Sequence, residues 1–371
     1  MSDYRVCSRC VMDTTASDIE FDAQGVCNYC RDYQAKLTAV RRDDADRSAE
    51  RERFLQKIRA DGEGKEYDCI VGVSGGVDSS YVLYLAKRNG LRPLAVHLDN
   101  GWNSELASHN IASLVTSLGV DLYTHVIDWN ENRDLQLSFF KANVVDIELL
   151  MDNAMLALNY QQAARHGVKH ILSGANLATE GLALPAGWVH YKRDVRNVRA
   201  IHRRFGKIPI KTHLLLSTIA HAWYELVRGI RWESLLDHFH YNKFEALETL
   251  TREVGYKPYP YKHYESVFTR FYQAYILPRK FGFDKRRVHL STLIVSGQMT
   301  REEALALLAT PPYPDARQLE QDRIFVMKKL GFTDREFEEY LAAPPVPHAA
   351  YPSELPMYRM LVKFYGFLRG R

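Results

Sequence analysis

The stretch from Tyr67 to Gly90 constrains the fold of this 371-residue chain more than any other segment. Cys69 to Val73 is a short apolar run, which predicts a buried strand. The strand leads into the turn Ser74-Gly75-Gly76-Val77-Asp78, and Ser79 opens a helix with an apolar inner side. A glycine-rich turn between a strand and a helix N-terminus offers free backbone N–H groups and the positive end of the helix dipole. The stretch therefore predicts a site for a phosphate group.

The turn differs from the two most familiar nucleotide loops, because it has neither Gly-Lys-Ser/Thr nor Gly-x-Gly-x-x-Gly. An ordinary tight turn is the plain alternative. The string Ser-Gly-Gly-Val-Asp-Ser, however, resembles the pyrophosphate-binding loop of the N-type ATP pyrophosphatases, which cleave ATP between the α and β phosphates. The resemblance implies that ATP is bound by Ser74, Gly75, Gly76, Val77, Asp78, Ser79 and Ser80.

Strand and helix patterns alternate after this loop. Strands are expected at Arg92 to Asp99, Asp121 to Asp128 and Lys169 to Ser173, and helices at Ser104 to Leu118 and Asp152 to His166. Alternation of this kind predicts an α/β fold, a Rossmann-like parallel sheet with helices on both faces. Ligands of such folds bind at the carboxyl ends of the strands.

Polar, small and aromatic residues cluster where the expected strands end. On this basis His97, Asp99, Gly174 and Asn176 are candidate nucleotide-binding residues, and Trp102 is a candidate substrate-binding residue. Each of them alone is more often ordinary loop chemistry. Glu180 is a candidate second carboxylate beside Asp78 for Mg²⁺, because hard oxygen ligands suit that ion.

Four cysteines precede the loop in two pairs, Cys7-x2-Cys10 and Cys27-x2-Cys30. Two such pairs close a tetrahedral four-thiolate site that suits zinc. Disulfides or a redox pair are the alternatives, and neither fits a spaced double pair in a cytoplasmic chain as well. Four protein ligands leave the metal no open position, so we expect a structural zinc.

Composition places the chain among ordinary proteins of the cytoplasm. No N-terminal signal segment is apparent and no apolar run is long enough to span a membrane. The net charge of +4 does not demand a nucleic-acid partner. We expect a zinc-binding module at 1–32, a charged connecting helix at 33–66, an ATP-binding domain at 67–210 and a mostly helical region at 211–371, where strand signals fade.

Further blocks in the sequence resemble one enzyme family. The double Cys-x2-Cys with FDAQGVCNYC, the glycine loop, PLAVHLDNGWNSE, SGANLATE, KHYESVFTRF and DKRRVHLSTLIVSGQMTR appear in the order typical of the N-acetyl sugar amidotransferases of bacterial surface-polysaccharide biosynthesis. The similarity runs from about Cys7 to Arg301. It implies that ATP activates the N-acetyl amide oxygen of a nucleotide-sugar, and that ammonia replaces this oxygen to give an acetamidino sugar.

The resemblance also implies roles for residues whose pattern alone indicates only a solvated basic face. The implied catalytic residues are Asp78, Lys262, Arg270, Lys285 and Arg286, and the implied substrate-binding residues are Trp102, His263, Glu265, Arg287 and Arg301. Arginine suits this task because its guanidinium pairs with phosphate through two hydrogen bonds.

The source of ammonia is expected to be another protein. Glutamine hydrolysis needs an activated nucleophile, and Cys69, the one cysteine outside the two pairs, lies in an apolar strand where a thiol is inert. The resemblance implies a separate glutaminase with a barrel subunit like that of imidazole glycerol phosphate synthase.

Two other functions are compatible with the loop. A tRNA thiolase would also combine cysteine modules with this loop, but sulfur transfer needs a spare reactive cysteine or an iron–sulfur cluster. A zinc-bearing scaffold that only binds AMP would have no need of the two carboxylates Asp78 and Glu180.

Overall fold

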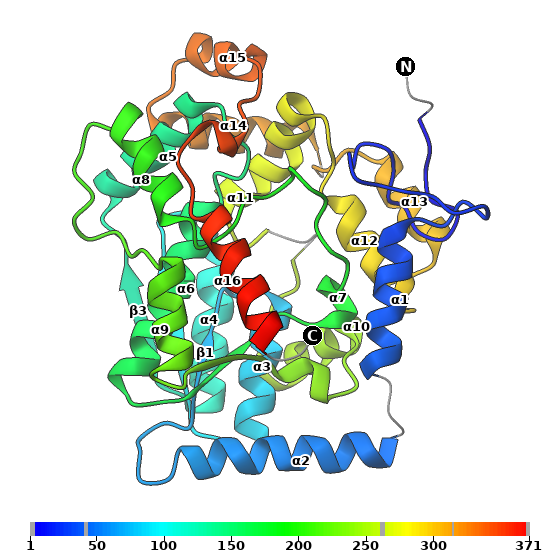
Figure 1. The fold of residues 1–371 in the computed structure, drawn as a ribbon, viewed down its shortest axis with the longest axis vertical. Coiled ribbons are helices and arrows are strands. Elements are labelled where there is room, and N and C mark those ends of the chain that lie inside the picture. Colours follow the sequence, from blue (N-terminus) through cyan, green and yellow to red (C-terminus); the bar gives the residue numbers. More distant parts are fainter. Residues whose placement is uncertain (1–3, 41–43, 260–263, 314, 369–371) are drawn as a thin grey trace.

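The computed structural model describes residues 4–40, 44–259, 264–313 and 315–368 (Figure 1). Two residues with implied roles, Lys262 and His263, lie outside the described residues, so their roles stay predictions.

Five strands and the helices between them form the body of the fold. The strands are β1 (Cys69–Gly72), β2 (Pro93–Asp99), β3 (Leu122–Val126), β4 (His170–Ser173) and β5 (Arg231–Ser234). The helices up to the last strand are α1 (Asn28–Val40), α2 (Asp44–Asp61), α3 (Val77–Arg88), α4 (Glu105–Leu118), α5 (Trp129–Ala142), α6 (Leu149–Arg165), α7 (Leu177–Glu180), α8 (Val195–Phe205) and α9 (Thr218–Leu226).

Within the described residues, the regular elements after the last strand are all helices. They are η1 (Leu235–His238), α10 (Lys243–Val254), α11 (Val267–Phe271), η2 (Tyr272–Phe281), α12 (Arg286–Val295), α13 (Arg301–Ala309), α14 (Ala316–Leu330), α15 (Asp334–Ala342), η3 (His348–Ala350) and α16 (Leu355–Leu368). No helix of the described part is long and apolar enough to cross a membrane.

All strand pairings in the sheet are parallel, in the order β3-β2-β1-β4-β5. This confirms the predicted α/β fold and puts β1, with the glycine loop at its end, at the centre. The strand β5 was not expected, since the sequence places the end of the ATP-binding domain at residue 210. Arg231–Ser234 has a single large apolar residue, Trp232, because an edge strand needs little apolar side chain.

Apolar cores cover both faces of the sheet. One core packs β1 against α3, α4 and α10 and includes Val82, Leu114 and Leu250. The other packs β1 and β2 against α6 and includes Ile70, Leu158 and Tyr160. Helices therefore lie on both faces, as a parallel sheet requires. The charged segment 33–66 forms most of α1 and all of α2, and Leu55 and Ile58 of α2 join the first core.

The cysteine module and the C-terminal helices share a third core. Cys7, Cys10, Cys27 and Cys30 belong to the same buried cluster as residues of α5, α11, α12, α14 and α15. Figure 1 shows the module and α1 beside α12 and α13, although these segments lie far apart in the sequence. The module is thus packed against the C-terminal helices and is not a separate domain joined only by a linker.

Candidate active site and metal centre

The glycine loop places unused backbone donors at the start of α3. Gly76 is the N-cap of this helix, and no side chain caps it. The loop is held internally instead: the Ser79 hydroxyl donates to the Gly76 carbonyl at 3.2 Å, and the Ser74 backbone N–H donates to Ser79 Oγ at 3.4 Å. An uncapped helix N-terminus next to two glycines can donate to an anion.

Two tyrosines fix the turn at Gly75, which has a φ of +84°. The hydroxyl of Tyr256 donates to the Gly75 carbonyl at 2.8 Å, and that of Tyr259 donates to the same oxygen at 3.0 Å. A Cβ at Gly75 would lie 3.1 Å from the Tyr259 hydroxyl and from the Ala107 carbonyl. The sequence analysis missed both tyrosines, because no local pattern in residues 255–259 connects them to a loop 180 residues earlier.

Gly174, after β4, allows the chain to pass directly over the loop. A Cβ at this position would lie 2.9 Å from the Ser79 backbone nitrogen and 3.1 Å from the Asp78 carbonyl carbon. Glycine is therefore needed here for close approach between two backbones.

A cavity of about 460 Å³ opens at the carboxyl ends of β1 and β4. Its side with the glycine loop is formed by Ser74, Gly76, Val77, Asp78, Ser79, Ser173, Gly174, Ala175, Glu180, Lys243, Tyr259 and Glu265, most of which are polar or small. Its apolar side is formed by Met155, Leu172, Trp232, Phe244 and Leu247, which come from α6, β4, β5 and α10. Two buried oxygens in its wall, Ser173 Oγ and Asn159 Oδ1, have no hydrogen-bond partner among the described residues. A polar loop opposite an apolar wall suits a nucleotide, with its phosphates on one side and its base on the other.

Two carboxylates meet near the hydroxyl of Tyr241. This hydroxyl donates a hydrogen bond to Oδ1 of Asp78. Burial raises the pKa of Tyr241 far above its usual value, and the nearby charges of Asp78 and Glu180 raise it further. The side chain is therefore a neutral donor that orients Asp78. Because both carboxylates line the cavity, they could hold Mg²⁺ there.

Glu265 brings the C-terminal region to the same cavity. Its backbone carbonyl accepts from the Ser104 N–H at 2.8 Å, and Ser266 forms an antiparallel bridge with Asn103. The segment that precedes α11 thus lies against the end of β2. Glu265 lines the same cavity as Asp78 and Glu180. Its substrate-binding role, which the resemblance implies, stays a prediction.

Several residues that the sequence assigns to nucleotide or substrate face the interior instead. The Nδ1–H of His97 donates to the Val73 carbonyl at 2.8 Å, while Nε2 is 2.9 Å from the amide nitrogen of Asn103. Both ring nitrogens are therefore used within the protein. Ser80 is fully buried and does not line the cavity, and Trp102 is 1% exposed with its indole N–H on Gln136.

Asp99 and Asn176 have local roles at the strand ends. Asp99 accepts from the Gly101 N–H at 2.9 Å, which closes the turn after β2. Asn176 caps α7 by accepting from the Thr179 N–H at 2.8 Å and donates to the Gly174 carbonyl. Neither residue lines the cavity. Their role is to fix the backbone of the loops that follow β2 and β4.

Most of the basic residues with implied catalytic roles are held by partners elsewhere. Arg270 forms a buried two-point ion pair with Asp322, at 2.6 and 2.7 Å, which joins α11 to α14. Arg286 pairs with Asp284 at 2.7 Å and donates to the carbonyls that end α13. Neither residue lines the nucleotide cavity, because each guanidinium is directed to its partner.

Arg287 and Arg301 bind the cysteine module and not the cavity. Arg301 donates from Nε to the Cys10 carbonyl and from Nη2 to the Cys7 carbonyl, both at 3.0 Å. Arg287 pairs with Asp13 at 2.8 Å and donates to the Val11 carbonyl at 2.8 Å. In this structure the two arginines attach the module to α12 and α13. The substrate contact implied by the resemblance stays a prediction.

Lys285 does not line the nucleotide cavity either, but it pairs with a carboxylate directly before a helix that does. Its Nζ is 3.3 Å from Oε2 of Glu148, directly before α6, and later turns of α6 at Met155 and Asn159 line the cavity. Lys192 completes this charged region, with Nζ at 2.8 Å from Asp146 and 2.7 Å from Asp152. The sequence analysis did not single out Lys192, Asp146, Glu148 or Asp152, since they belong to no motif.

The four N-terminal cysteines form a metal-binding cluster. All four sulfur atoms are buried and lie within 4.8 Å of one another, with Cys7 and Cys30 at 3.9 Å and Cys10 and Cys27 at 3.7 Å. Four thiolates about 2.3 Å from a tetrahedral zinc would be separated by roughly 3.8 Å. Backbone N–H groups of Cys27 and Met12 point at Cys7 and Cys10 sulfurs, at 3.2 and 3.4 Å. The residues fit zinc, and no cysteine is in a disulfide.

Comparison with known proteins finds a family similarity in the C-terminal region. Residues 265–365 match the family described as LPS biosynthesis protein WbpG-like, C-terminal domain. The match supports, over this part of the chain, the resemblance to enzymes of surface-polysaccharide biosynthesis. No curated protein is matched.

Solved structures with similarity include two synthetases. An NMN synthetase from Francisella tularensis is 14% identical, with 58% of this chain and 99% of that chain covered and a TM-score of 0.28. An NH3-dependent NAD synthetase from Campylobacter jejuni is 16% identical, with 60% and 100% covered and a TM-score of 0.30. Values this low carry no conclusion about function.

Proposed function

We propose that the chain is an ATP-dependent N-acetyl sugar amidotransferase, because residues 265–365 match the WbpG-like C-terminal domain of LPS biosynthesis proteins. Its substrates are ATP, ammonia and a nucleotide-activated sugar with an N-acetyl group. Its products are the acetamidino sugar, AMP and pyrophosphate. We place the reaction in the cytoplasm, in the biosynthesis of a surface glycan such as the O-antigen.

One observation carries the proposal: a single cavity joins the glycine loop to Glu265, the first residue of the matched domain. The loop supplies a phosphate site, and Asp78 and Glu180 supply carboxylates on the same wall. A nucleotide with its base against the apolar wall would direct its phosphates to the loop. The substrate would then have to approach from the side that the C-terminal domain forms.

The chemistry requires that an amide oxygen become a leaving group. In the first step this oxygen attacks the α-phosphorus of ATP, and the bond from that phosphorus to the bridging oxygen breaks to release pyrophosphate. Ammonia then adds to the activated carbon and loses a proton. The carbon–oxygen bond breaks, AMP leaves and the amidine forms. The protein must hold the α-phosphorus in line with the amide oxygen and stabilise charge on pyrophosphate.

The residues of the cavity suit these tasks. The uncapped N-terminus of α3 and the Ser74 hydroxyl would donate to pyrophosphate oxygens as charge develops on them, while Ser79 holds the loop. Asp78 and Glu180 would hold Mg²⁺, which neutralises phosphate charge when bound. Lys243, in the cavity wall, is a further cation on this side. Tyr241 keeps Asp78 directed at the site through its hydrogen bond.

The buried cysteines support an external source of ammonia. All five cysteines are buried, and burial raises the pKa of Cys69 well above its usual value, so its thiol is not a nucleophile. The same observation counts against a thiolase. We propose that a separate glutaminase with a barrel subunit delivers ammonia, and that zinc on Cys7, Cys10, Cys27 and Cys30 has a structural role.

The decisive experiment incubates the chain with ATP, Mg²⁺, ammonium chloride and a panel of diacetamido nucleotide-sugars. Mass spectrometry should show one oxygen replaced by NH, with AMP and pyrophosphate in equal amounts. Asp78→Asn should abolish the product, whereas the matched control Asp121→Asn, at the opposite end of the sheet, should keep it. Pyrophosphate release without a modified sugar would overturn the amidotransferase assignment. Turnover with glutamine and no ammonium would overturn the external ammonia source.

A further inference from the structure

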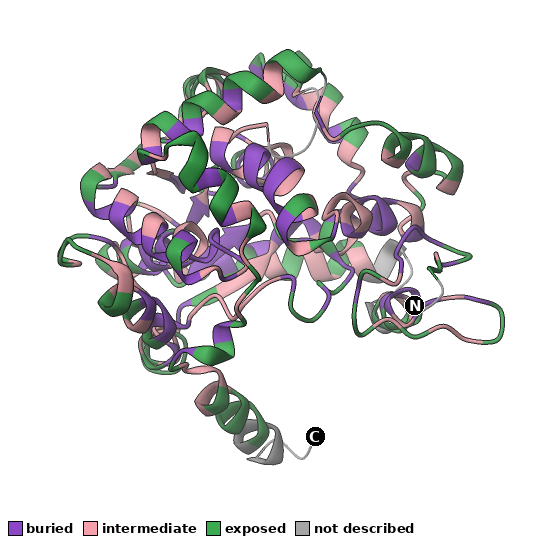
Figure 2. Cartoon of the chain, turned by 90° about the horizontal axis from the view of Figure 1, so that it is seen from above, coloured by how far each residue is buried: buried purple, intermediate pink, exposed green. Residues whose placement is uncertain are grey.

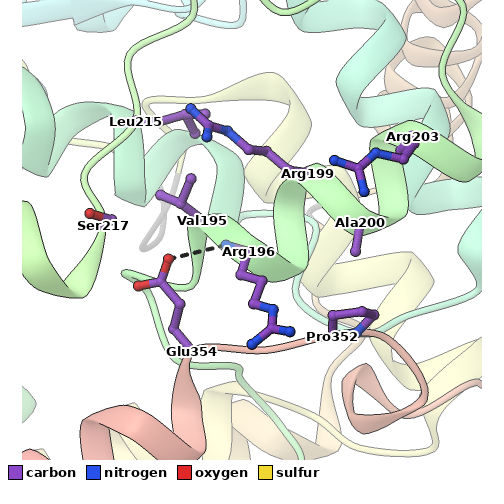
Figure 3. Close-up of a pocket in the computed structure, with 9 residues that line it drawn as sticks. All are labelled: Val195, Arg196, Arg199, Ala200, Arg203, Leu215, Ser217, Pro352 and Glu354. Carbon is purple, nitrogen blue, oxygen red and sulfur yellow. Dashed lines mark hydrogen bonds between the residues drawn. The ribbon is translucent and has the colours of Figure 1, made fainter.

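A second cavity, remote in sequence from the glycine loop, is lined by arginines. It has a volume of about 510 Å³ and is formed by Val195, Arg196, Arg199, Ala200, Arg203, Leu215, Ser217, Pro352 and Glu354 (Figure 3). Arg199 and Arg203 also line an adjoining hollow of about 320 Å³ with Pro209 and Ile210. The two hollows together form a cationic groove along α8.

The sequence of α8 explains why the arginines gather on one side. Val195, Val198 and Ile201 are buried, and the helix packs against α5 with this face. Arg196, Arg199 and Arg203 follow each other at spacings of three and four residues, which puts them on the outer face. All three side chains are exposed, and none forms an ion pair with a carboxylate among the described residues.

The one carboxylate in the cavity wall is already occupied by backbone donors. Glu354 accepts from the Thr218 N–H at 2.8 Å and from the Arg196 N–H at 3.3 Å. It therefore ties the first turns of α8 and α9 together, as the dashed line in Figure 3 shows for Arg196. The groove is lined by three guanidinium groups and one carboxylate, so its net charge is positive.

Two helices with exposed apolar residues begin at this groove. Ser217 and Glu354 line it, and α9 and α16 start at the next residues, Thr218 and Leu355. On α16 the exposed apolar residues are Met360, Leu361 and Val362, with Met360 63% exposed. On and after α9 they are Ile219, Trp223, Leu226 and Val227. Figure 2 shows α16 projecting from the body, with most of its described residues exposed.

The composition of residues 355–371 favours a lipid surface over a protein one. This segment, LPMYRMLVKFYGFLRGR, has four basic and no acidic residues. Arg359 and Lys363 are four positions apart and share one narrow stripe, so most of the helix circumference is apolar or aromatic. Helices with a cationic stripe and a broad apolar, aromatic face lie in the interface of anionic membranes. A globular protein partner would require no such uniform charge.

We propose that the arginine groove and α16 form a docking surface for an anionic phospholipid bilayer. Arg196, Arg199 and Arg203 would bind lipid phosphates, because guanidinium groups pair with phosphate oxygens through two hydrogen bonds. The exposed apolar residues of α16 and α9 would enter the boundary between headgroups and acyl chains. The chain would lie on the membrane without crossing it. This attachment is independent of the proposed reaction, since it involves neither the loop nor its cavity.

The test is co-sedimentation of the full chain with vesicles, in the absence of all substrates. The vesicles are pure phosphatidylcholine or contain about a quarter phosphatidylglycerol, which matches the charge of a cytoplasmic leaflet. We expect binding to the anionic vesicles alone, and weaker binding at high salt. Substitution of Arg196, Arg199 and Arg203 by Gln should weaken binding about a hundredfold, since each cation near the surface contributes roughly tenfold or less.

Two matched variants separate the proposal from general effects of charge and hydrophobicity. Gln at Arg317, Lys328 and Arg335 removes three exposed cations from α14 and α15, and binding should stay as in the parent chain. Ser at Met360, Leu361 and Val362 should abolish binding, whereas Ser at Leu305, Leu307 and Ile324, which are also exposed, should not. Circular dichroism checks that each variant is folded.

Three results would overturn the proposal. These are an absence of binding to anionic vesicles, equal binding to neutral vesicles, and full binding by the arginine variant. If the chain ignores vesicles but the same variants lose the glutaminase partner, the surface is a protein interface instead.

Discussion

The hydroxyl of Tyr256 donates a hydrogen bond to the carbonyl of Gly75 at 2.8 Å, and so a residue from the segment after α10 fixes the loop after β1. Tyr259 donates to the same oxygen at 3.0 Å. The Gly75 carbonyl is thereby held by two donors, one of which, Tyr259, also lines the nucleotide cavity. The loop conformation depends on these two distant phenols as well as on its own glycines.

Removal of the Tyr256 hydroxyl should therefore weaken ATP binding without unfolding the protein. We expect Tyr256→Phe to raise the Kd for ATP about fivefold, since one neutral hydrogen bond contributes about 1 kcal/mol. Tyr256→Phe with Tyr259→Phe should weaken binding by more than the product of the single effects, because each phenol compensates for the other. Titration calorimetry with ATP measures this. Tyr67→Phe, whose hydroxyl contacts Asp121, is the matched control. Wild-type affinity in the double variant would contradict the argument.

Two glycines at the site should differ sharply when substituted by alanine. A Cβ at Gly174 would lie 2.9 Å from the backbone nitrogen of Ser79, whereas one at Gly76 would meet nothing closer than Ser74 Oγ at 3.4 Å. We expect Gly174→Ala to lower the free energy of unfolding by about 1–3 kcal/mol, as overpacking does. Gly76→Ala, at a φ of −73°, should change it by less than about 0.5 kcal/mol. Urea unfolding measures both, and equal stability of the two variants would be inconsistent with this close approach.

The cysteine cluster predicts a zinc content that depends on four cysteines and not on the fifth. Cys27→Ala should lose the metal, while Cys69→Ala, in the buried strand β1, should keep one zinc per chain. Elemental analysis of the purified proteins measures this. Loss of zinc should also expose residues 4–30 to protease, because a module this small depends on its metal. Full zinc content in Cys27→Ala would exclude the four-cysteine site.

The sequence predicts the centre of the fold well because the relevant interactions are local. The loop, the alternation of strands and helices, and the cap of α4 depend on neighbouring residues: Ser104 accepts from the Ala107 N–H, and Gly119 takes a φ of +56°. The paired cysteines are recognisable for the same reason, since the two cysteines of each pair are only three residues apart in the sequence. Parallel pairing follows from the alternation itself.

The parts that the sequence does not predict depend on long-range partners. Arg301 and Cys10 are separated by 291 residues, and no local pattern links a guanidinium to a distant backbone carbonyl. The same holds for Trp102, which follows a strand end but is buried in the third core. Lys285 and Arg287 belong to one motif but have different partners. Lys285 pairs with Glu148 and Arg287 with Asp13, because successive positions of a helix face different sides.

Arg301 offers a direct test of whether it supports the metal module or binds substrate. Its two hydrogen bonds hold the carbonyls of Cys7 and Cys10, at 3.0 Å each. Arg301→Gln should destabilise the module by about 2 kcal/mol, a typical value for hydrogen bonds of a charged group. Zinc release to a chelator should then be about tenfold or more faster, with an unchanged KM for the sugar. Arg323→Gln, on α14, is the control. A raised KM with normal zinc retention would restore the substrate role.

Acid should destabilise the protein through a buried histidine. His213 is 6% exposed, and neither ring nitrogen has a hydrogen-bond partner among the described residues. Burial lowers the pKa of His213 to about 4, although the charge of Glu131 and the nearby backbone carbonyl of Leu150 oppose this shift, and the charge of His125 adds to it. The unfolded chain, with a usual histidine pKa near 6.5, therefore binds more protons between about pH 6.5 and pH 4. Stability from this group is complete above pH 6.5 and falls as the pH drops towards 4.

The substitution His213→Leu should remove this dependence. Between pH 7 and pH 5 the parent chain should lose roughly 2 kcal/mol more stability than the variant, since one pKa unit corresponds to about 1.4 kcal/mol. Urea unfolding at the two pH values gives the difference. His109→Leu, at an exposed position of α4, is the matched control and should behave as the parent does. Because the leucine leaves no ring to protonate, an unchanged pH dependence in His213→Leu would mean that another buried group controls acid stability.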